Sequence, residues 1–222
     1  MSVVLALDPG TNCGWALAAP GMPKPRGGVY ELPDVERDIG LYAEAFVDWL
    51  VPFCRLERVT DIVAEGPLIV QHRDERTGQT SVNMHEIETL VGIYTVAAYG
   101  CRLLGLPKLV RAARSTVCAH FIACGGGPNY RRKYIKAATI AVCQRKGWGV
   151  TLPDKSAPSE DLADAKATLD WFVCDRGIKV GWDCQPCGGP LFQGQPGVRI
   201  DESNKRAAKA LLRSAQSFDR GG

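Results

Sequence analysis

The sequence predicts a mixed α/β domain in which helices flank a central sheet. Short runs rich in β-branched and apolar residues, at Val3–Leu7 and Val59–Ala64, are typical of strands. Longer segments repeat apolar residues at helical spacing, and the order is strands first, then strands alternating with helices. At 222 residues the chain is long enough for one domain with a sizeable core, or a domain with an appendage.

The first three predicted strands should form a meander. Val3–Leu7 runs into an Asp8-Pro9-Gly10 turn, and further strands are expected at Gly14–Ala18 and Gly28–Leu32. Asp34 is expected to cap the helix that follows. The apolar positions of that helix are Ile39, Tyr42, Ala43, Phe46 and Leu50. Val59–Ala64 is the next strand, and it would be buried if it lies parallel to the first.

The remaining elements alternate. Gln71–Ser81 is polar, charged and without period, so we expect a mobile loop there. A long helix follows, with one apolar stripe: Met84, Ile87, Val91, Tyr94, Ala98 and Cys101. Then come a strand at 108–110, a helix at 115–123, a glycine-rich hinge at 125–128, a helix at 130–146 capped by Asn129, and a helix at 159–174 capped by Ser159.

Composition after about residue 180 becomes rich in Gly and Pro. We therefore expect a main domain at residues 1–178 and an extension at 179–222 that holds a basic helix, is partly disordered and ends Arg220-Gly221-Gly222. The pair Cys184-x-x-Cys187 resembles half of a zinc site, but zinc needs four ligands. No second pair or His follows it, and the three histidines lie far upstream, so a plain turn is favoured.

The composition is that of a soluble globular protein. The N-terminal apolar run is too short for a signal peptide, and no segment reaches the roughly 20 apolar residues of a membrane span. With nine cysteines and no export signal, we expect a cytoplasmic protein with reduced thiols. Residues 101–150 hold ten Lys or Arg and no acid, which favours a polyanionic partner such as nucleic acid. A solvated basic helix face explains the charge run equally well.

Four carboxylates stand out as candidate functional groups. Asp8 and Glu65 end two apolar strands, and Asp161 and Asp164 lie three apart in the last predicted helix. If the strands are neighbours, the four acids share one edge and would repel each other unless cations held them together, an arrangement that suits divalent metals and phosphate chemistry. Singly, each has an ordinary explanation as a turn residue, a solvated strand end or a helix-dipole partner.

Five short motifs in a fixed order span most of the chain, from Val3 to about Asp175. They are Ala6–Thr11 with Gly14–Ala16, Ile62–Glu65, Leu90–Tyr94, Lys136–Ala138 seven residues before Cys143, and Asp161–Ala165. In this order they resemble the RuvC-type Holliday junction resolvases of the ribonuclease H-like superfamily, and among these the bacteriophage and prophage members most. The resemblance implies a ribonuclease H-like fold for the predicted α/β domain.

The resemblance also implies a function. Asp8, Glu65, Asp161 and Asp164 would be the catalytic ligands of two Mg²⁺ ions, about 3.5–4 Å apart in such sites, with Mn²⁺ able to substitute. The family cuts four-way DNA junctions as a homodimer, by symmetric paired nicks. Lys136 falls where relatives carry a lysine near the active site, and is assigned to stabilising charge on the phosphate. Its alternative is a helix lysine whose stem covers apolar surface.

Further basic residues are expected to contact DNA. Arg131, Arg132 and Lys133 share the first turn of a predicted helix, where the helix dipole favours anions. Arg73 and Arg76 follow Glu65 in the predicted loop and could reach a branched substrate. Relatives place an aromatic residue three positions after the glutamate. This chain has Leu68 there, so no stacking role or sequence preference is carried over.

Three alternatives remain open. Actin-like sugar kinases and ATPases also begin with Asp-x-Gly-Thr, but no second phosphate loop or adenosine motif is visible. A nuclease with the same centre could act on flaps, forks or other branched DNA, because loops rather than metal chemistry select the substrate. A catalytically silent DNA-binding accessory protein would keep the fold without turnover.

Overall fold

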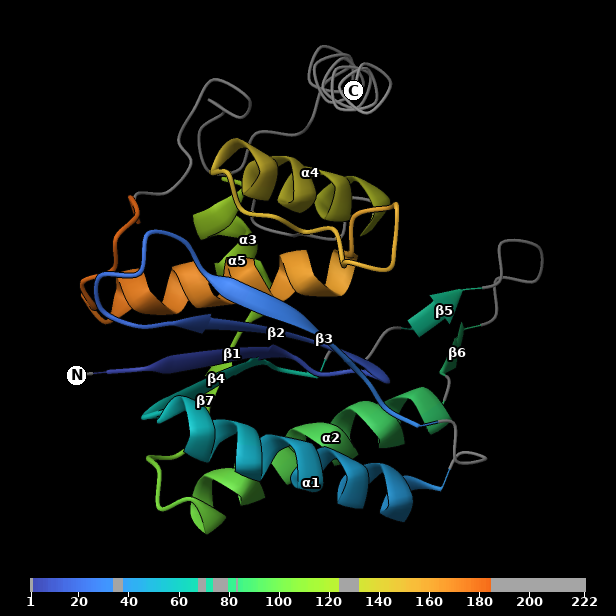
Figure 1. Cartoon of the computed structure of the whole chain (residues 1–222). Coiled ribbons are helices and arrows are strands. Elements are labelled where there is room, and N and C mark those ends of the chain that lie inside the picture. Colours follow the sequence, from blue (N-terminus) through green and yellow to red (C-terminus); the bar gives the residue numbers. More distant parts are fainter. Residues whose placement is uncertain are drawn as a thin grey trace.

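The computed structural model describes residues 2–33, 38–67, 71–73, 80–82, 84–123 and 132–184, with only the backbone described at 71–73, 80–82, 84–86, 132 and 133. The fold is a mixed α/β sheet with helices on both faces, as predicted (Figure 1). The central sheet has the strand order β3-β2-β1-β4-β7. Its strands are β1 (Val4–Asp8), β2 (Asn12–Ala18), β3 (Arg26–Glu31), β4 (Asp61–Glu65) and β7 (Val110–Ala112).

The strand directions match the sequence interpretation. The first three strands form the predicted antiparallel meander, with Asp8 opposite Gly14. Strand β4 lies parallel to β1, and β7 lies parallel to β4. The carboxyl ends of β1, β4 and β7 therefore meet at one edge of the sheet.

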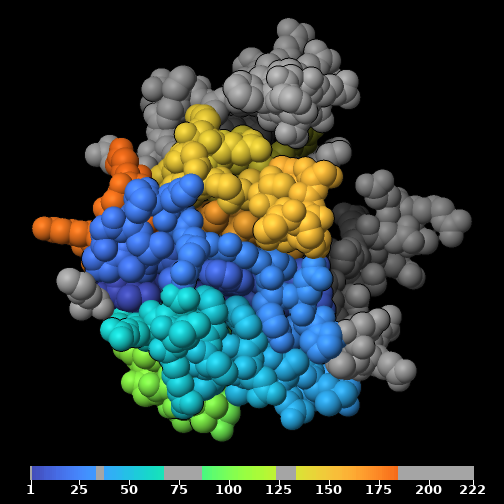
Figure 2. Space-filling view, viewed as in Figure 1, coloured from blue at the N-terminus to red at the C-terminus, as the bar shows by residue number. Residues whose placement is uncertain are grey.

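Helices cover the two faces as separate layers (Figure 1). One face packs against α1 (Ile39–Glu57) and α2 (Met84–Leu103), and the other against α3 (Arg114–Phe121), α4 (Arg132–Arg145) and α5 (Glu160–Asp175). Helix α5 lies directly on β1 and β2, with α4 on its outer side. Figure 2 shows the layering from outside, with β3 (blue) between α1 (blue to cyan) and α4 with the loop after it (yellow to orange).

The side chains of β1 and β2 explain why α5 approaches so closely. Residues alternate between the faces of a strand. The large side chains of Leu5, Leu7 and Leu17 point towards α1 and α2, whereas small residues face α5. The small residues on that face include Ala6, Ala16 and Ala18. Helix α5 is buried along most of its length, from Leu162 to Asp170.

Several predicted details are wrong. Asp34 lies outside the described residues, and the cap of α1 is Asp38, whose Oδ1 accepts hydrogen bonds from the Gly40 and Leu41 N–H groups. The segment expected to be a loop, Gln71–Ser81, contains two short antiparallel strands, β5 (Gln71–Arg73) and β6 (Thr80–Val82). The strand predicted at 108–110 begins two residues later.

Other predictions fall partly or wholly outside the description. The hinge at 125–128, Asn129, Cys187 and the tail helix at 201–217 lie outside the described residues. The division at 178/179 stays a prediction, although Ile178, Val180, Trp182 and Cys184 pack against the core. In the part of the chain that is described, seven cysteines are free thiols, and no helix is long and apolar enough to cross a membrane.

Candidate functional site

Two parallel strands deliver Asp8 and Glu65 to the same edge of the sheet. Strands β1 and β4 are paired with Leu7 opposite Ala64, and Asp8 and Glu65 are the next residue of each strand. The Glu65 side chain is buried, with 7% of the residue exposed. A rigid strand end fixes the direction of each carboxylate, which a ligand of a hard cation requires.

Helix α5 adds Asp161 and Asp164 from above this edge. The Ser159 Oγ accepts a hydrogen bond from the Leu162 N–H (3.2 Å), so Ser159 caps the helix as predicted. The helix start lies against β2 because Gly14 has no side chain: a Cβ there would lie 2.0 Å from the Asp161 carbonyl oxygen. Residues three apart on a helix share a face, so both acids approach the sheet edge together.

The pKa of Asp8 shows that the four acids act on one another. It is raised well above its ordinary value, first by burial and then by the charges of Asp164, Glu65 and Asp161. Burial also raises the pKa of Asp164, which is 6% exposed, while Arg114 and Lys136 lower it. The structure thus brings together all four acids identified in the sequence.

Arg114 is a fifth member of this centre, and sequence reasoning missed it. Its Nη1 lies 2.8 Å from Glu65 Oε1 and its Nη2 lies 3.4 Å from Asp164 Oδ2. The two carboxylates come from opposite sides of the site, so one guanidinium bridges strand β4 and helix α5. Glu65 pairs with Ala112 in the sheet, and Arg114 follows two residues later at the start of α3. A base just after a parallel strand was the available clue.

Lys136 lies near the same centre. Its Nζ is 2.5 Å from Glu160 Oε2, and its charge lowers the pKa of Asp164. Helix α4 therefore presents a cation beside the first turn of α5.

The structure says less about the predicted DNA contacts. Arg76 and Arg131 lie outside the described residues. Arg73 is in β5, and Arg132 and Lys133 are in the first turn of α4, with no side chain described for these three. Leu68 also falls outside the description. These contacts stay predictions.

The donor set fits hard divalent cations. Asp8, Glu65, Asp161 and Asp164 offer only carboxylate oxygens, the donors that Mg²⁺ and Mn²⁺ prefer. The raised pKa of Asp8 marks negative charge that Arg114 offsets only in part. A divalent cation would supply the missing positive charge, so these four residues suit such a metal.

No protein-family model and no curated protein matches this sequence. Among solved structures, the chain is similar to RuvC from Thermus thermophilus, with a TM-score of 0.55 and 14% sequence identity over 79% of this chain and 96% of that one. It is also similar to T. thermophilus RuvC in complex with a Holliday junction substrate, with a TM-score of 0.53 and 16% identity over 80% of this chain and 97% of that one. The chain has the fold of RuvC, the ribonuclease H-like fold that the sequence predicted.

Proposed function

We propose that this chain is a divalent-metal-dependent DNA endonuclease that resolves four-way junctions. The observation that carries the proposal is the cluster of four carboxylates, from two strand ends and one helix, whose mutual repulsion raises the pKa of Asp8. The likeness of the fold to RuvC supports the same chemistry, and one of the two RuvC structures is a complex with a Holliday junction substrate. The predicted kinship with bacteriophage members and the cytoplasmic location stay predictions.

The four acids would hold two Mg²⁺ ions, with Mn²⁺ as a substitute. Bound there, the ions would act as Lewis acids on the scissile phosphate and lower the pKa of a bound water. Asp8 and Glu65 give the site rigid ligands because each follows directly from a paired strand. Asp161 and Asp164 close the site from the helix, at a height set by the contact between Gly14 and the α5 backbone.

Two cations of the chain complete the proposed centre. Arg114 links Glu65 and Asp164, so it orients both carboxylates while the site lacks metal. Lys136 lies beside the start of α5, and we assign it to stabilising negative charge on the phosphate. In the metal-free protein its Nζ is paired with Glu160, whose side chain is 52% exposed and readily displaced.

Substrate binding would rest on the basic part of the chain. The run of bases without acids at residues 101–150 includes Arg131, Arg132 and Lys133 at the start of α4, which would contact the DNA backbone. Arg73 and Arg76 would reach the junction from the segment after Glu65. Paired nicks require two centres, so we propose that the active form is a homodimer.

Cleavage of labelled DNA by the purified full chain in Mg²⁺ tests this proposal. The substrates are a four-way junction, a flap, a fork and linear duplex. We expect paired symmetric nicks confined to the junction. Cutting spread over several branched forms would favour the debranching nuclease instead, and tight junction binding without cutting in Mg²⁺ or Mn²⁺ would favour the accessory protein.

Matched variants assign the cleavage to this centre. Asp8→Asn and Asp164→Asn should each abolish cleavage and leave junction binding largely intact, because only the charge of one ligand is removed. Asp61→Asn is the control. Asp61 begins β4 at the end opposite Glu65, where its Oδ2 accepts a hydrogen bond from Thr60. Cleavage at the wild-type rate by both Asp8→Asn and Asp164→Asn would overturn the assignment.

A further inference from the structure

We propose that the chain holds a second metal site, for Zn²⁺, built from His120, Asp170, Cys174 and Cys184. His120 comes from α3, Asp170 and Cys174 come from the C-terminal half of α5, and Cys184 lies in the segment that follows α5. Asp170 is six residues beyond Asp164 on the same helix, which is about 9 Å along the axis. The site is therefore distinct from the four-acid centre.

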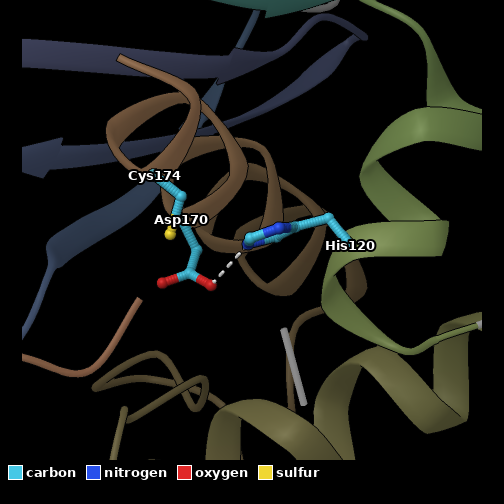
Figure 3. Close-up of side chains that lie close together, drawn as sticks. All are labelled: His120, Asp170 and Cys174. Carbon is cyan, nitrogen blue, oxygen red and sulfur yellow. Dashed lines mark hydrogen bonds and ion pairs between the residues drawn. The ribbon is translucent and has the colours of Figure 1, made fainter. Parts of the chain in front are cut away.

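Three of these side chains already converge. The candidate ligand atoms of His120, Asp170 and Cys174 all lie within 4.8 Å of one another. Figure 3 shows the imidazole and the carboxylate facing each other across the gap between α3 and α5, with the Cys174 sulfur beside them. His120 Nε2 is 3.1 Å from Asp170 Oδ2. A metal ion would take the place of the proton that these two atoms share.

Cys184 supplies a fourth donor. The Cys174 thiol donates a hydrogen bond to the Cys184 carbonyl oxygen, and the two thiols interact with each other. Burial is the main cause that raises the pKa of both thiols, so both stay protonated without a metal. Binding of Zn²⁺ would release the two thiol protons to solvent and form two Zn–S bonds.

The donor set points to zinc rather than magnesium. Two sulfurs, one imidazole nitrogen and one carboxylate oxygen meet the four-coordinate requirement of zinc, and thiolates are poor ligands for Mg²⁺. The isolated Cys184-x-x-Cys187 pair gave no such set in the sequence. The fold changes that conclusion by placing His120 and Cys174 near Cys184. Cys187 lies outside the described residues and is not part of the proposed site.

The surroundings balance the charge that zinc would leave. Two thiolates, one carboxylate and Zn²⁺ sum to one negative charge. Lys146 Nζ lies 3.4 and 3.3 Å from the two Asp170 oxygens, and the Trp182 indole N–H donates to Asp170 Oδ1 at 2.8 Å. Such outer partners orient a ligating carboxylate. The same contacts also make a closed network without metal, and the experiment must separate the two.

Zinc here would fasten the segment after α5 to the helical layer. Trp182 packs edge-on against Trp148, with ring centroids 5.5 Å apart, and Cys184 also packs on the core. A metal bridging α3, α5 and Cys184 would fix that segment at one further point. The expected role is structural, since four protein ligands leave no open position for substrate.

Metal content and Co²⁺ spectroscopy of the full chain test the proposal. We expect one zinc ion per chain after passage over chelating resin, and a thiolate-to-cobalt charge-transfer band when Co²⁺ replaces it. Cys174→Ala and His120→Gln should lose the tightly held zinc, and Cys174→Ala should weaken the band. Cys54→Ala, a buried cysteine in α1 on the other face of the sheet, should keep both.

Wild-type protein alone can overturn the proposal, so poor folding of a variant does not protect it. Zinc that is lost on the resin, with no charge-transfer band from Co²⁺, would show a metal-free ion network. A band unchanged in Cys174→Ala would do the same. We also expect Zn²⁺ to raise the Tm of the metal-free wild type by about 5 °C. None of these readouts uses DNA cleavage, so they stand apart from the proposed nuclease activity.

Discussion

At the scale of single residues, Asp8 concentrates the electrostatic cost of the site. Its carboxylate is partly buried at the end of β1, and three other carboxylates act on it. Arg114 offsets only part of this repulsion, as the raised pKa shows. Folding therefore holds Asp8 in an environment that disfavours its charged form, which makes the residue suited to metal binding and unfavourable for the stability of the metal-free protein.

Asp8→Asn should stabilise the protein in Mg²⁺-free buffer. The folded-state pKa of Asp8 lies well above its ordinary value of 3.8, so between these values the folded chain binds more protons than the unfolded chain. The wild type consequently loses stability as the pH rises through this window, and the loss persists at neutral pH. Each pKa unit of the difference corresponds to about 2–4 °C of Tm gained by the variant at pH 7.

Thermal unfolding followed from pH 4 to pH 8 measures this effect, with Asp61→Asn as the control for loss of a carboxylate at the other end of β4. Mg²⁺ should then raise the Tm of the wild type more than that of Asp8→Asn, because the variant lacks one ligand charge. An Asp8→Asn variant less stable than the wild type at pH 7 without Mg²⁺ would contradict the electrostatic account.

Residue types explain what the sequence could predict here. The four acids were visible because each follows an apolar strand or repeats at helical spacing. Arg114 was hidden because its place depends on the register of β7 against β4, and that strand was predicted two residues too early. His120 and Cys174 were hidden for a different reason. They lie on separate helices, and only tertiary packing brings them together.

At the scale of elements, the approach of α5 to the sheet sets the site. Gly14 is the contact point, since a Cβ there would lie 2.0 Å from the Asp161 carbonyl oxygen and 2.4 Å from its carbon. Backbone on both sides cannot yield as a side chain could. Gly14→Ala must therefore displace the start of α5 or the turn of β2, and with it Asp161 or Asp8.

We expect Gly14→Ala to lower the free energy of unfolding by about 1–3 kcal/mol. Cleavage should fall on the order of 100-fold, because a displacement near 1 Å misaligns the ligands. Gly149→Ala is the matched control, since a Cβ at Gly149 meets nothing within 4 Å. Denaturant unfolding and cleavage rates measure the two effects. Full activity in Gly14→Ala would mean that α5 tolerates a different height above the sheet.

Elements were predictable where periodicity was long. Helices α1, α2 and α5 each carry several turns of apolar spacing, so their existence followed from the sequence. Strands β5 and β6 have three residues each and pair only with one another, which leaves no pattern to detect. The cap of α1 was misplaced because two aspartates precede the helix, and the nearer one, Asp38, makes the hydrogen bonds.

At the scale of the whole molecule, the sheet order fixes how many nuclease centres one chain can offer. The parallel strands β1, β4 and β7 end at a single edge, and within the described ranges one four-acid centre forms there. One chain would therefore make one cut at a time. Symmetric nicks on two strands of a junction need a second centre in a second copy, related by the two-fold symmetry that a four-way junction itself can adopt.

A mixed dimer tests this directly. Wild-type chains and Asp8→Asn chains carrying different affinity tags can be co-expressed, and the species with both tags isolated. The mixed dimer should nick one strand of a junction but should not produce the paired nicks of the wild-type dimer, because only one of its centres can hold metal fully. Asp61→Asn in place of Asp8→Asn should restore paired nicking. Light scattering must show two 24.0 kDa chains per particle for the design to hold. Paired nicks at the wild-type rate from the mixed species would mean that a single centre cuts both strands in turn, and the requirement for two copies would fall.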